Sequence, residues 1–305
     1  MEFEIRLEEP ANIREGVNRE PWSEPGFLKS VALTHNLKAW LLTCHKGEEL
    51  VATLPLYERS RTGIKYLVEP VTAYYQPLEF FNASGHEPSR LLRELSIMEA
   101  IAGYLKKSYR RLRIKLYPAN SDVRGFLWSG MNARPYYTFV HRRGDTLDPI
   151  RNEKRKLKSA WEIPYQFDGQ FNLEAFLALY HQMHKRKERK LSLPPDKMES
   201  FCRALHEQGV LHQHNVTLEN EIVSSEIYLG KGEGTAYALY RASKPEEMAK
   251  GVSSWHTARA LDELLKVYDK VDMCGANIAD VARFKAALGL KLAVFYQIEY
   301  GSKII

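Results

Sequence analysis

The segment Lys250–Ser254 combines residue types that bind phosphate groups. It reads Lys-Gly-Val-Ser-Ser and opens a helical pattern that continues to Tyr268. Unpaired N–H groups and the helix dipole favour an anion at a helix N-terminus, and Gly251 permits close backbone approach. Ser253 as a simple N-cap is the alternative interpretation. We expect a phosphorylated ligand to bind here, at Gly251, Val252, Ser253 and Ser254.

Two charged residues stand in otherwise apolar surroundings. Asp272 ends a short strand pattern, and strand ends carry working groups in open α/β sheets. It could transfer a proton or cap the turn that follows. Lys285 interrupts a short helical pattern that is otherwise largely apolar; it is either a buried functional lysine or one that extends over its own helix into solvent. Glu226 and His256 are weaker candidates for a general base.

Other site chemistries find little support. His181 and His184 lie three residues apart on one helical pattern, and His212 and His214 share a strand pattern. A zinc site made from these residues would need further ligands that the spacing does not supply, so we expect no metal. The sequence has no nucleophile elbow, P-loop or dinucleotide-binding glycine motif.

The chain contains two segments with a shared residue frame. One reads ANSDVRGFLWSGM from Ala119, and the other reads ANIADVARFKAALGL from Ala276. Both contain Ala-Asn, then Asp-Val, a Phe four residues after the Asp, and a Gly before an apolar residue. Lys285 stands where the first segment has Leu127. Each segment follows a long helix and a strand pattern, which predicts a tandem duplication.

A second match lies upstream and in the same order. Glu49-Leu-Val-Ala-Thr53 resembles Glu221-Ile-Val-Ser-Ser225, and each follows a turn within a hairpin pattern. Two matches in one order and one structural context argue against coincidence.

The predicted elements define the fold class. Strands that alternate with helices predict an α/β fold with a mixed sheet and helices on its faces. Periodicity breaks at His141–Pro149, so we predict domains 1–145 and 146–305. The main predicted helices are Ser89–Lys107, Ile150–Trp161, Leu173–Arg189, Asp196–Gln208 and Val252–Tyr268, and the main strands outside the hairpins are Arg111–Tyr117, Tyr136–Val140, Lys270–Met273 and Leu292–Tyr300.

Composition limits the class of protein. The 305 residues are 44% hydrophobic with a net charge of +6, which suits two cores and anionic partners. Basic residues cluster at Arg151–Lys158 and Lys185–Lys190, either as solvated helix faces or as a landing site for a polyanion. We expect no transmembrane segment and no secretory signal. Three widely spaced cysteines suggest a reducing, cytoplasmic compartment.

A series of motifs in the second half resembles a known family. It includes Phe176–Tyr180, Ala238–Arg241, Gly251–Trp255, Val271–Ala276 and Phe284-Lys285, preceded by a basic helix with Arg151, Arg155 and Ala160. This order resembles the bacterial-type Fem (FemABX, FemAB-like) aminoacyl transferases and the related BioF2-like acetyltransferases. Phe27–Ser30 resembles an early motif of the same family, although the first half matches more loosely.

The resemblance implies a tandem GNAT-like fold and the chemistry of N-acyl transfer. In that chemistry an amine attacks an activated carbonyl directly, and a tetrahedral oxyanion forms. The resemblance places Phe284 and Lys285 at the catalytic centre, where Lys285 could stabilise the oxyanion, and Asp272 lies in the same motif. The acyl donor would run beside the strand Thr235–Arg241, at Leu239, Tyr240 and Arg241. Acyl-CoA is the first expected donor, and an aminoacyl-tRNA used to modify a cell-wall precursor is the alternative.

The first half would then recognise the acceptor, a small-molecule or peptide amine. Its candidate binding residues are Lys29, Lys38, Tyr74 and Tyr75, with Trp22 nearby. A non-enzymatic module that binds nucleic acid or another ligand is the competing hypothesis, because the basic clusters alone would support it.

Overall fold

The computed structural model describes residues 3–13, 20–81, 85–188 and 190–301. The chain forms two compact units, Met1–Tyr136 with Val294–Ile305 (unit 1) and Tyr137–Ala293 (unit 2). The sequence placed the boundary after residue 145 and assigned the whole C-terminal strand to the second domain. The structure divides the chain differently because residues 297–300 of that strand pair with a strand of unit 1, Leu112–Lys115.

Unit 1 is built on an antiparallel sheet. The strands β1 (Glu4–Glu8), β2 (Lys38–Lys46), β3 (Glu49–Arg61) and β4 (Ile64–Leu67) lie in that order, and β5 (Glu79–Phe80) also pairs with β3. Strand β6 (Leu112–Lys115) pairs antiparallel with the end of β13 (Lys291–Tyr300). The helices of this unit are α1 (Pro25–His35), α2 (Glu87–Ser108) and α3 (Arg124–Trp128), and two short 3-10 turns at Pro10–Asn12 and Pro21–Ser23 precede α1.

Helix α2 supplies one side of the core of unit 1. Its buried residues Leu95, Met98, Ile101, Ala102 and Leu105 recur at helical spacing and pack with buried side chains of β2, β3 and β6. Helix α3 crosses α2 closely, because a Cβ on Gly125 would lie 2.5 Å from the Met98 Cβ. The predicted helix at 89–107 is therefore present, and its apolar face is buried as its periodicity indicated.

Unit 2 contains a mixed sheet. Strands β8 (Gln166–Asp168), β9 (Leu211–Leu218), β10 (Glu221–Leu229) and β11 (Thr235–Ser243) are antiparallel neighbours. Strand β12 (Lys270–Asp272) pairs parallel with β11 and antiparallel with residues 140–142 of β7 (Asn132–Arg142). The connection from β11 to β12 carries the helices α7 (Pro245–Ala249) and α8 (Val252–Val267), as a parallel crossover requires.

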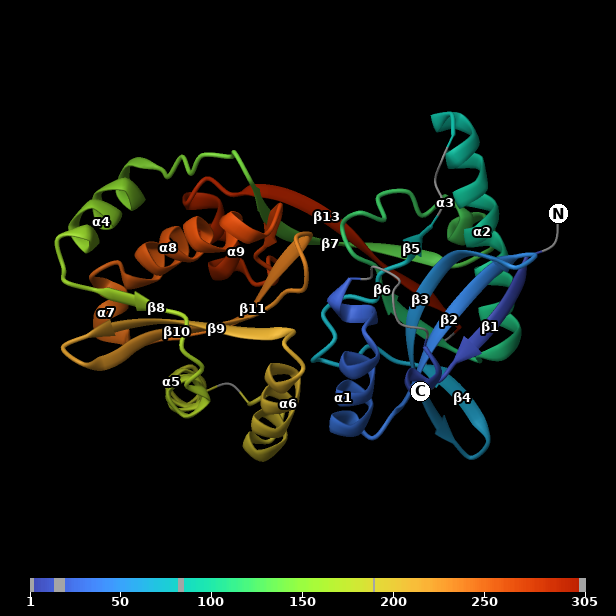
Figure 1. Cartoon of the computed structure of the whole chain (residues 1–305), viewed down its shortest axis with the longest axis horizontal. Coiled ribbons are helices and arrows are strands. Elements are labelled where there is room, and N and C mark those ends of the chain that lie inside the picture. Colours follow the sequence, from blue (N-terminus) through green and yellow to red (C-terminus); the bar gives the residue numbers. More distant parts are fainter. Residues whose placement is uncertain (1–2, 14–19, 82–84, 189, 302–305) are drawn as a thin grey trace. The chain divides into compact units, whose positions relative to one another are not determined.

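Helices cover both faces of this sheet, as the alternation of elements predicted. Helix α8 packs against β9–β12, whereas α5 (Leu173–Arg186) and α6 (Pro195–Glu207) pack on the opposite face (Figure 1). Helix α4 (Arg151–Trp161) contacts α8, and α9 (Ala279–Ala287) precedes β13. Arg189, the predicted last residue of one helix, lies outside the described residues.

The two sequence matches correspond to equivalent structural features. The hairpins β2–β3 and β9–β10 each shift register once, and the extra residue is Val51 in one and Val223 in the other. These valines are aligned in the sequence match. The second match aligns Asn120 with Asn277. Each asparagine forms two hydrogen bonds with one backbone residue, Asn120 with Leu78 at 3.0 and 2.7 Å and Asn277 with Tyr137 at 3.0 Å twice.

The strands that extend the two hairpins were missing from the predicted order. Strand β1 pairs with β2, and β8 pairs with β9, so each hairpin gains one extra strand at the same side. Strand β8 has only three residues, too few for alternation to be recognised in the sequence.

Candidate active site

In unit 2, strand β12 pairs with only the first three residues of β11. Their parallel pairing runs from Thr235 with Lys270 to Tyr237 with Asp272 and ends there, while β11 continues to Ser243. On its other side β11 has a bulge against β10, because Ile227 pairs with Tyr240 and Tyr228 with Ala238, which leaves Leu239 as the extra residue. We call residues 238–243 of β11 the β11 edge. It contains the three predicted donor-strand residues, Leu239, Tyr240 and Arg241.

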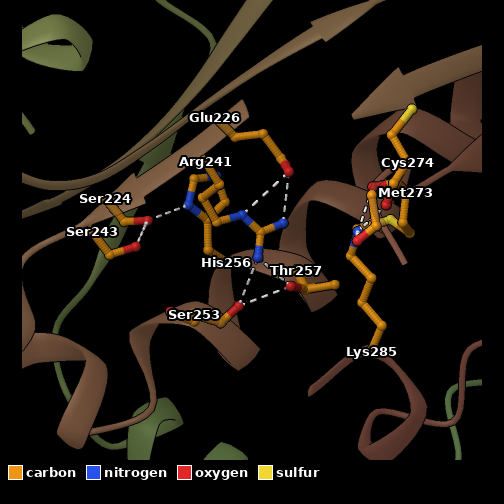
Figure 2. Close-up of polar contacts among 11 residues, drawn as sticks. Ser224, Glu226, Arg241, Ser243, Ser253, His256, Thr257, Met273, Cys274 and Lys285 are labelled. Atoms are coloured by element: carbon orange, nitrogen blue, oxygen red, sulfur yellow. Dashed lines mark hydrogen bonds and ion pairs between the residues drawn. The ribbon is translucent and has the colours of Figure 1, made fainter. Parts of the chain in front are cut away.

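Lys285 of α9 holds the backbone just after β12. Its Nζ donates to the Met273 carbonyl at 2.7 Å, to the Cys274 carbonyl, and weakly to the Gly275 carbonyl at 3.5 Å (Figure 2). Cys274 and Gly275 both have positive φ, at 48° and 55°, which turns the chain away from the strand path. With these carbonyls turned towards Lys285, β12 does not continue its pairing, and among the described residues the β11 edge has a strand partner only on its β10 side.

Burial changes the acidity of Lys285. The side chain is only 8% exposed, and this desolvation lowers its pKa from 10.5 to about 8, with the nearby Arg241 charge acting in the same direction. The charges of Cys274, Asp272 and Glu226 oppose that effect. At neutral pH the ammonium is therefore charged, but it lies much closer to titration than a surface lysine.

Asp272 caps the same turn. Its Oδ1 accepts hydrogen bonds from the Thr138 hydroxyl at 2.6 Å and from the Cys274 N–H at 2.8 Å, and the side chain is fully buried. Phe284, the other predicted residue of this motif, is half-buried and packs against the apolar core of unit 2. The structure thus brings Asp272 and Lys285 together around the Met273–Gly275 turn. Thr138 was not predicted as a site residue, and its distance of 134 residues from Asp272 left no signal in the sequence.

A buried ion pair lies at the β11 edge. Arg241 Nη2 and Nε donate to Glu226 Oε1 at 2.7 and 3.2 Å, and Nη1 donates to the Ser253 carbonyl at 3.0 Å and to the Thr257 hydroxyl (Figure 2). Arg241 therefore connects β10, β11 and α8. Tyr240, its neighbour, points to the other face, where its ring contacts Tyr180 of α5, and burial raises its pKa.

Two neutral histidines lie beside this pair. His256 of α8 is fully buried, and its Nδ1 lies 2.8 Å from the Ser224 hydroxyl, which in turn lies 2.7 Å from the Ser243 hydroxyl. Burial, assisted by the Arg241 charge, lowers the pKa of His256 well below its usual value. Burial also lowers the pKa of His214 on β9 to about 4. The serine partners were not predicted, because only the folded sheet brings Ser224 and Ser243 together.

The predicted phosphate site at the start of α8 is largely covered by α4. Gly251 has φ +95°, and a Cβ there would lie 3.0 Å from the Lys156 carbonyl oxygen of α4. The Ser254 hydroxyl donates to Glu153 Oε2 at 2.8 Å, while Lys156 binds the other oxygen of the same carboxylate at 2.8 Å. Val252 and Ser254 are buried, and Ser253 is half-buried. Glu153 thus brings a buried negative charge to the first turn of α8.

The predicted acceptor residues of unit 1 have separate environments. Tyr75 is fully buried against Trp22 and Phe295, and Tyr74 stacks edge-on against Tyr75. Lys38 lies over the Trp40 ring and pairs with Glu9. Lys29 is exposed on α1. The two tyrosine rings thus contact each other, with Tyr75 in the core and Tyr74 half-buried, and neither lysine shares their contacts.

The remaining sequence candidates make local contacts. The His184 ring bonds the Tyr180 carbonyl of its own helix, and over the described ranges no three His, Cys, Asp or Glu side chains gather as a metal site. The five basic side chains of α4 are all exposed. Among the helices that the structure describes, none is long and apolar enough to cross a membrane.

Comparison with known proteins identifies the fold. No protein-family model matches the chain, and no curated protein matches it. FemX matches with a TM-score of 0.67 at 12% identity, covering 97% of both chains. The C-terminal DUF2156 domain of a putative lysylphosphatidylglycerol synthetase from Agrobacterium fabrum matches with a TM-score of 0.57 at 8% identity, covering 90% of this chain and 87% of its own.

L-PGS from Bacillus licheniformis also matches, with a TM-score of 0.52 at 12% identity, over 91% of this chain and 88% of that one. The chain has a Fem-type tandem GNAT-like fold. The fold implied by the motif resemblance is therefore confirmed. At these identities the likeness concerns the fold, and the activity has to be argued from the site.

Proposed function

We propose that the protein is an N-acyltransferase that moves an acyl or aminoacyl group from an activated donor to an amine. The observation that carries this proposal is the side of the β11 edge that faces away from β10, beside the Lys285 turn, where the pairing with β12 has ended. Backbone groups without a strand partner can bind a donor in extended form, as an added strand would. A fixed positive charge nearby can stabilise the oxyanion that forms when the amine attacks.

Lys285 would support this reaction in two ways. Its contacts with Met273 and Cys274 keep β12 turned away and so keep the β11 edge open. Its ammonium also contributes positive charge near the edge, where Arg241 adds a second cation. The resemblance to the Fem-type transferases, which places the matching Phe-Lys pair at the catalytic centre, agrees with this role.

For the donor, the surroundings of α8 favour aminoacyl-tRNA over acyl-CoA. A CoA pyrophosphate at the start of α8 would lie beside the Glu153 carboxylate, and the two negative charges would repel each other. Helix α4, by contrast, presents exposed cations at Arg151, Lys154, Arg155, Lys156 and Lys158, of which Lys154 and Lys156 are paired with acidic residues. Such a helix suits a polyanion that contacts many phosphates at once.

The fold neighbours provide a second, weaker argument. Two of these neighbours are a putative lysylphosphatidylglycerol synthetase and L-PGS, and the first name fits transfer of an aminoacyl group more closely than transfer of an acetyl group. The acceptor of this chain would be an amine, as the sequence resemblance implies, and its proposed contacts stay those predicted from the sequence, Lys29, Lys38, Tyr74 and Tyr75.

The proposal is tested by transfer assays with two radiolabelled donors, a mixture of aminoacyl-tRNAs and acetyl-CoA, and with glycinamide and hydroxylamine as acceptors. We expect label to pass from aminoacyl-tRNA to the amine, with Lys285→Met inactive and the exposed control Lys107→Met unchanged. Transfer from acetyl-CoA alone would show that acyl-CoA, and not aminoacyl-tRNA, is the donor. Retention of tRNA without any transfer would instead support a nucleic-acid-binding module, and the enzyme proposal would fail.

A further inference from the structure

A row of charged and polar side chains crosses three strands beneath α8. His214, Glu226 and Arg241 are register partners on β9, β10 and β11, so their side chains point to one face of the sheet. That face is the α8 face, because Arg241 bonds Ser253 and Thr257 of this helix. A buried ion pair adds little net stability, since desolvation offsets its attraction. Its presence beside the β11 edge therefore suggests a chemical role.

Glu226 differs from the other buried glutamates of unit 2. Both oxygens of Glu153 are bonded, to Lys156 and Ser254, and both oxygens of Glu247 are bonded, to Lys250 and Tyr165. In Glu226, Oε1 accepts both bonds from Arg241. Among the described residues, none donates a hydrogen bond to its Oε2. One carboxylate oxygen is therefore left without a protein donor, in a side chain that is only 4% exposed.

The neighbouring groups are less suited to accept a proton. Asp272 is engaged with the Thr138 hydroxyl and the Cys274 N–H. His256 is fully buried with its Nδ1 2.8 Å from the Ser224 hydroxyl, and His214 lies on β9, two strands away from β11. Glu226, by contrast, lies on β10 beside the β11 edge and close enough to act electrostatically on Lys285.

We propose that Glu226 accepts the proton that the attacking amine loses during transfer, directly or through one water molecule, and that Arg241 is the positioning residue that fixes it. This inference rests on the proposed N-acyl transfer. The amine nitrogen forms a bond to the donor carbonyl carbon, and the positively charged nitrogen of the adduct gives its proton to Glu226. The bond from carbon to the leaving oxygen or sulfur breaks, and the leaving group takes the proton from Glu226. The products are an amide and a neutral leaving group, and the carboxylate is regenerated.

The test compares Glu226→Gln with wild type, using the donor that supports transfer and two acceptors, glycinamide and hydroxylamine. We expect kcat with glycinamide to fall at least about 100-fold, the range of general-base catalysis, with little change in KM. The loss with hydroxylamine should be at least about tenfold smaller, because its adduct nitrogen is more acidic and loses its proton to water. The control Glu58→Gln alters a buried carboxylate of unit 1, bonded by Tyr109, and should leave both rates unchanged.

The outcomes separate the two proposals. Equal losses with the two acceptors would show that Glu226 is only structural, and a glycinamide rate within about threefold of wild type would also overturn its role. Absence of transfer by the wild type overturns the proposed function and this assignment with it. If Glu226→Gln fails to fold, Arg241→Lys serves instead, and we expect it to lower kcat for glycinamide more than for hydroxylamine.

Discussion

Replacing Lys285 with methionine tests the role of the Met273–Gly275 turn. The substitution keeps the length and much of the volume of the side chain but removes its charge and its hydrogen-bond donors. Two carbonyls, those of Met273 and Cys274, lose their closest donor. The buried ammonium, which the fold has to desolvate, is removed at the same time.

These two effects on stability have opposite signs. Each buried carbonyl left without a partner costs about 1–3 kcal/mol, or about 2–6 kcal/mol for both. The lowering of the Lys285 pKa from 10.5 to about 8 corresponds to about 3 kcal/mol of unfavourable burial, since one pKa unit is about 1.4 kcal/mol. Removing the lysine recovers this amount. We therefore expect the free energy of unfolding to change by no more than about 3 kcal/mol, while kcat falls about 100-fold or more.

The assay pairs urea unfolding with the rate of transfer. Because the unfolded lysine binds its proton up to about pH 10.5 and the folded one only up to about pH 8, wild type should gain stability relative to Lys285→Met as pH rises across this interval. The gain should be absent below pH 8 and complete above pH 10.5. A variant that is as stable as expected but transfers at the wild-type rate would refute the role given to Lys285.

Three further predictions follow from the structure. Wild-type kcat should decline as pH rises through about 8, because Lys285 loses its charge there; a flat profile between pH 7 and pH 9.5 would contradict this. In urea unfolding, Asn120→Ala should lower the free energy of unfolding by about 2–4 kcal/mol and Asn277→Ala by about 1 kcal/mol or less. The reason is that Asn120 bonds Leu78 in the core, whereas Asn277 bonds exposed backbone. Equal losses of stability would show that burial of the hydrogen bonds does not determine their contribution. Gly289→Ala should lower the melting temperature more than Gly130→Ala. Both glycines have φ near +80°, but only a Cβ at position 289 would contact backbone, 2.5 Å from the Asp148 carbonyl oxygen. A larger decrease in melting temperature for Gly130→Ala would contradict the steric argument.

Local patterns in the sequence predicted much of the fold. Helical periodicity located α2, α4, α5, α6 and α8, and turn chemistry located both hairpins. The match of Val51 with Val223 even aligned the two bulges, although their geometry could not be read from the residue types. Those features depend on residues close together in the chain, where the patterns are strongest.

The surroundings of the site depend on contacts between distant residues. The hydrogen bond from Ser254 to Glu153 connects residues that are 101 positions apart in the sequence. Helix α4 was predicted from its own pattern, which does not indicate the element against which it packs. The C-terminal strand was assigned to one domain because its own pattern says nothing about its partner, β6. The sequence identified Lys285 as unusual, but only the folded turn shows that its ammonium binds carbonyl oxygens.

The bonds from Arg241 to Ser253 and Thr257 fasten the β11 edge to the first two turns of α8. A ligand that adds to this edge would therefore restrain the helix as well as the strand. Its arrival should be visible as slower amide hydrogen exchange at the start of α8, even if the ligand never touches that helix. Exchange measured with and without aminoacyl-tRNA or acetyl-CoA would thus report donor binding before any product is formed, and would do so without an acceptor.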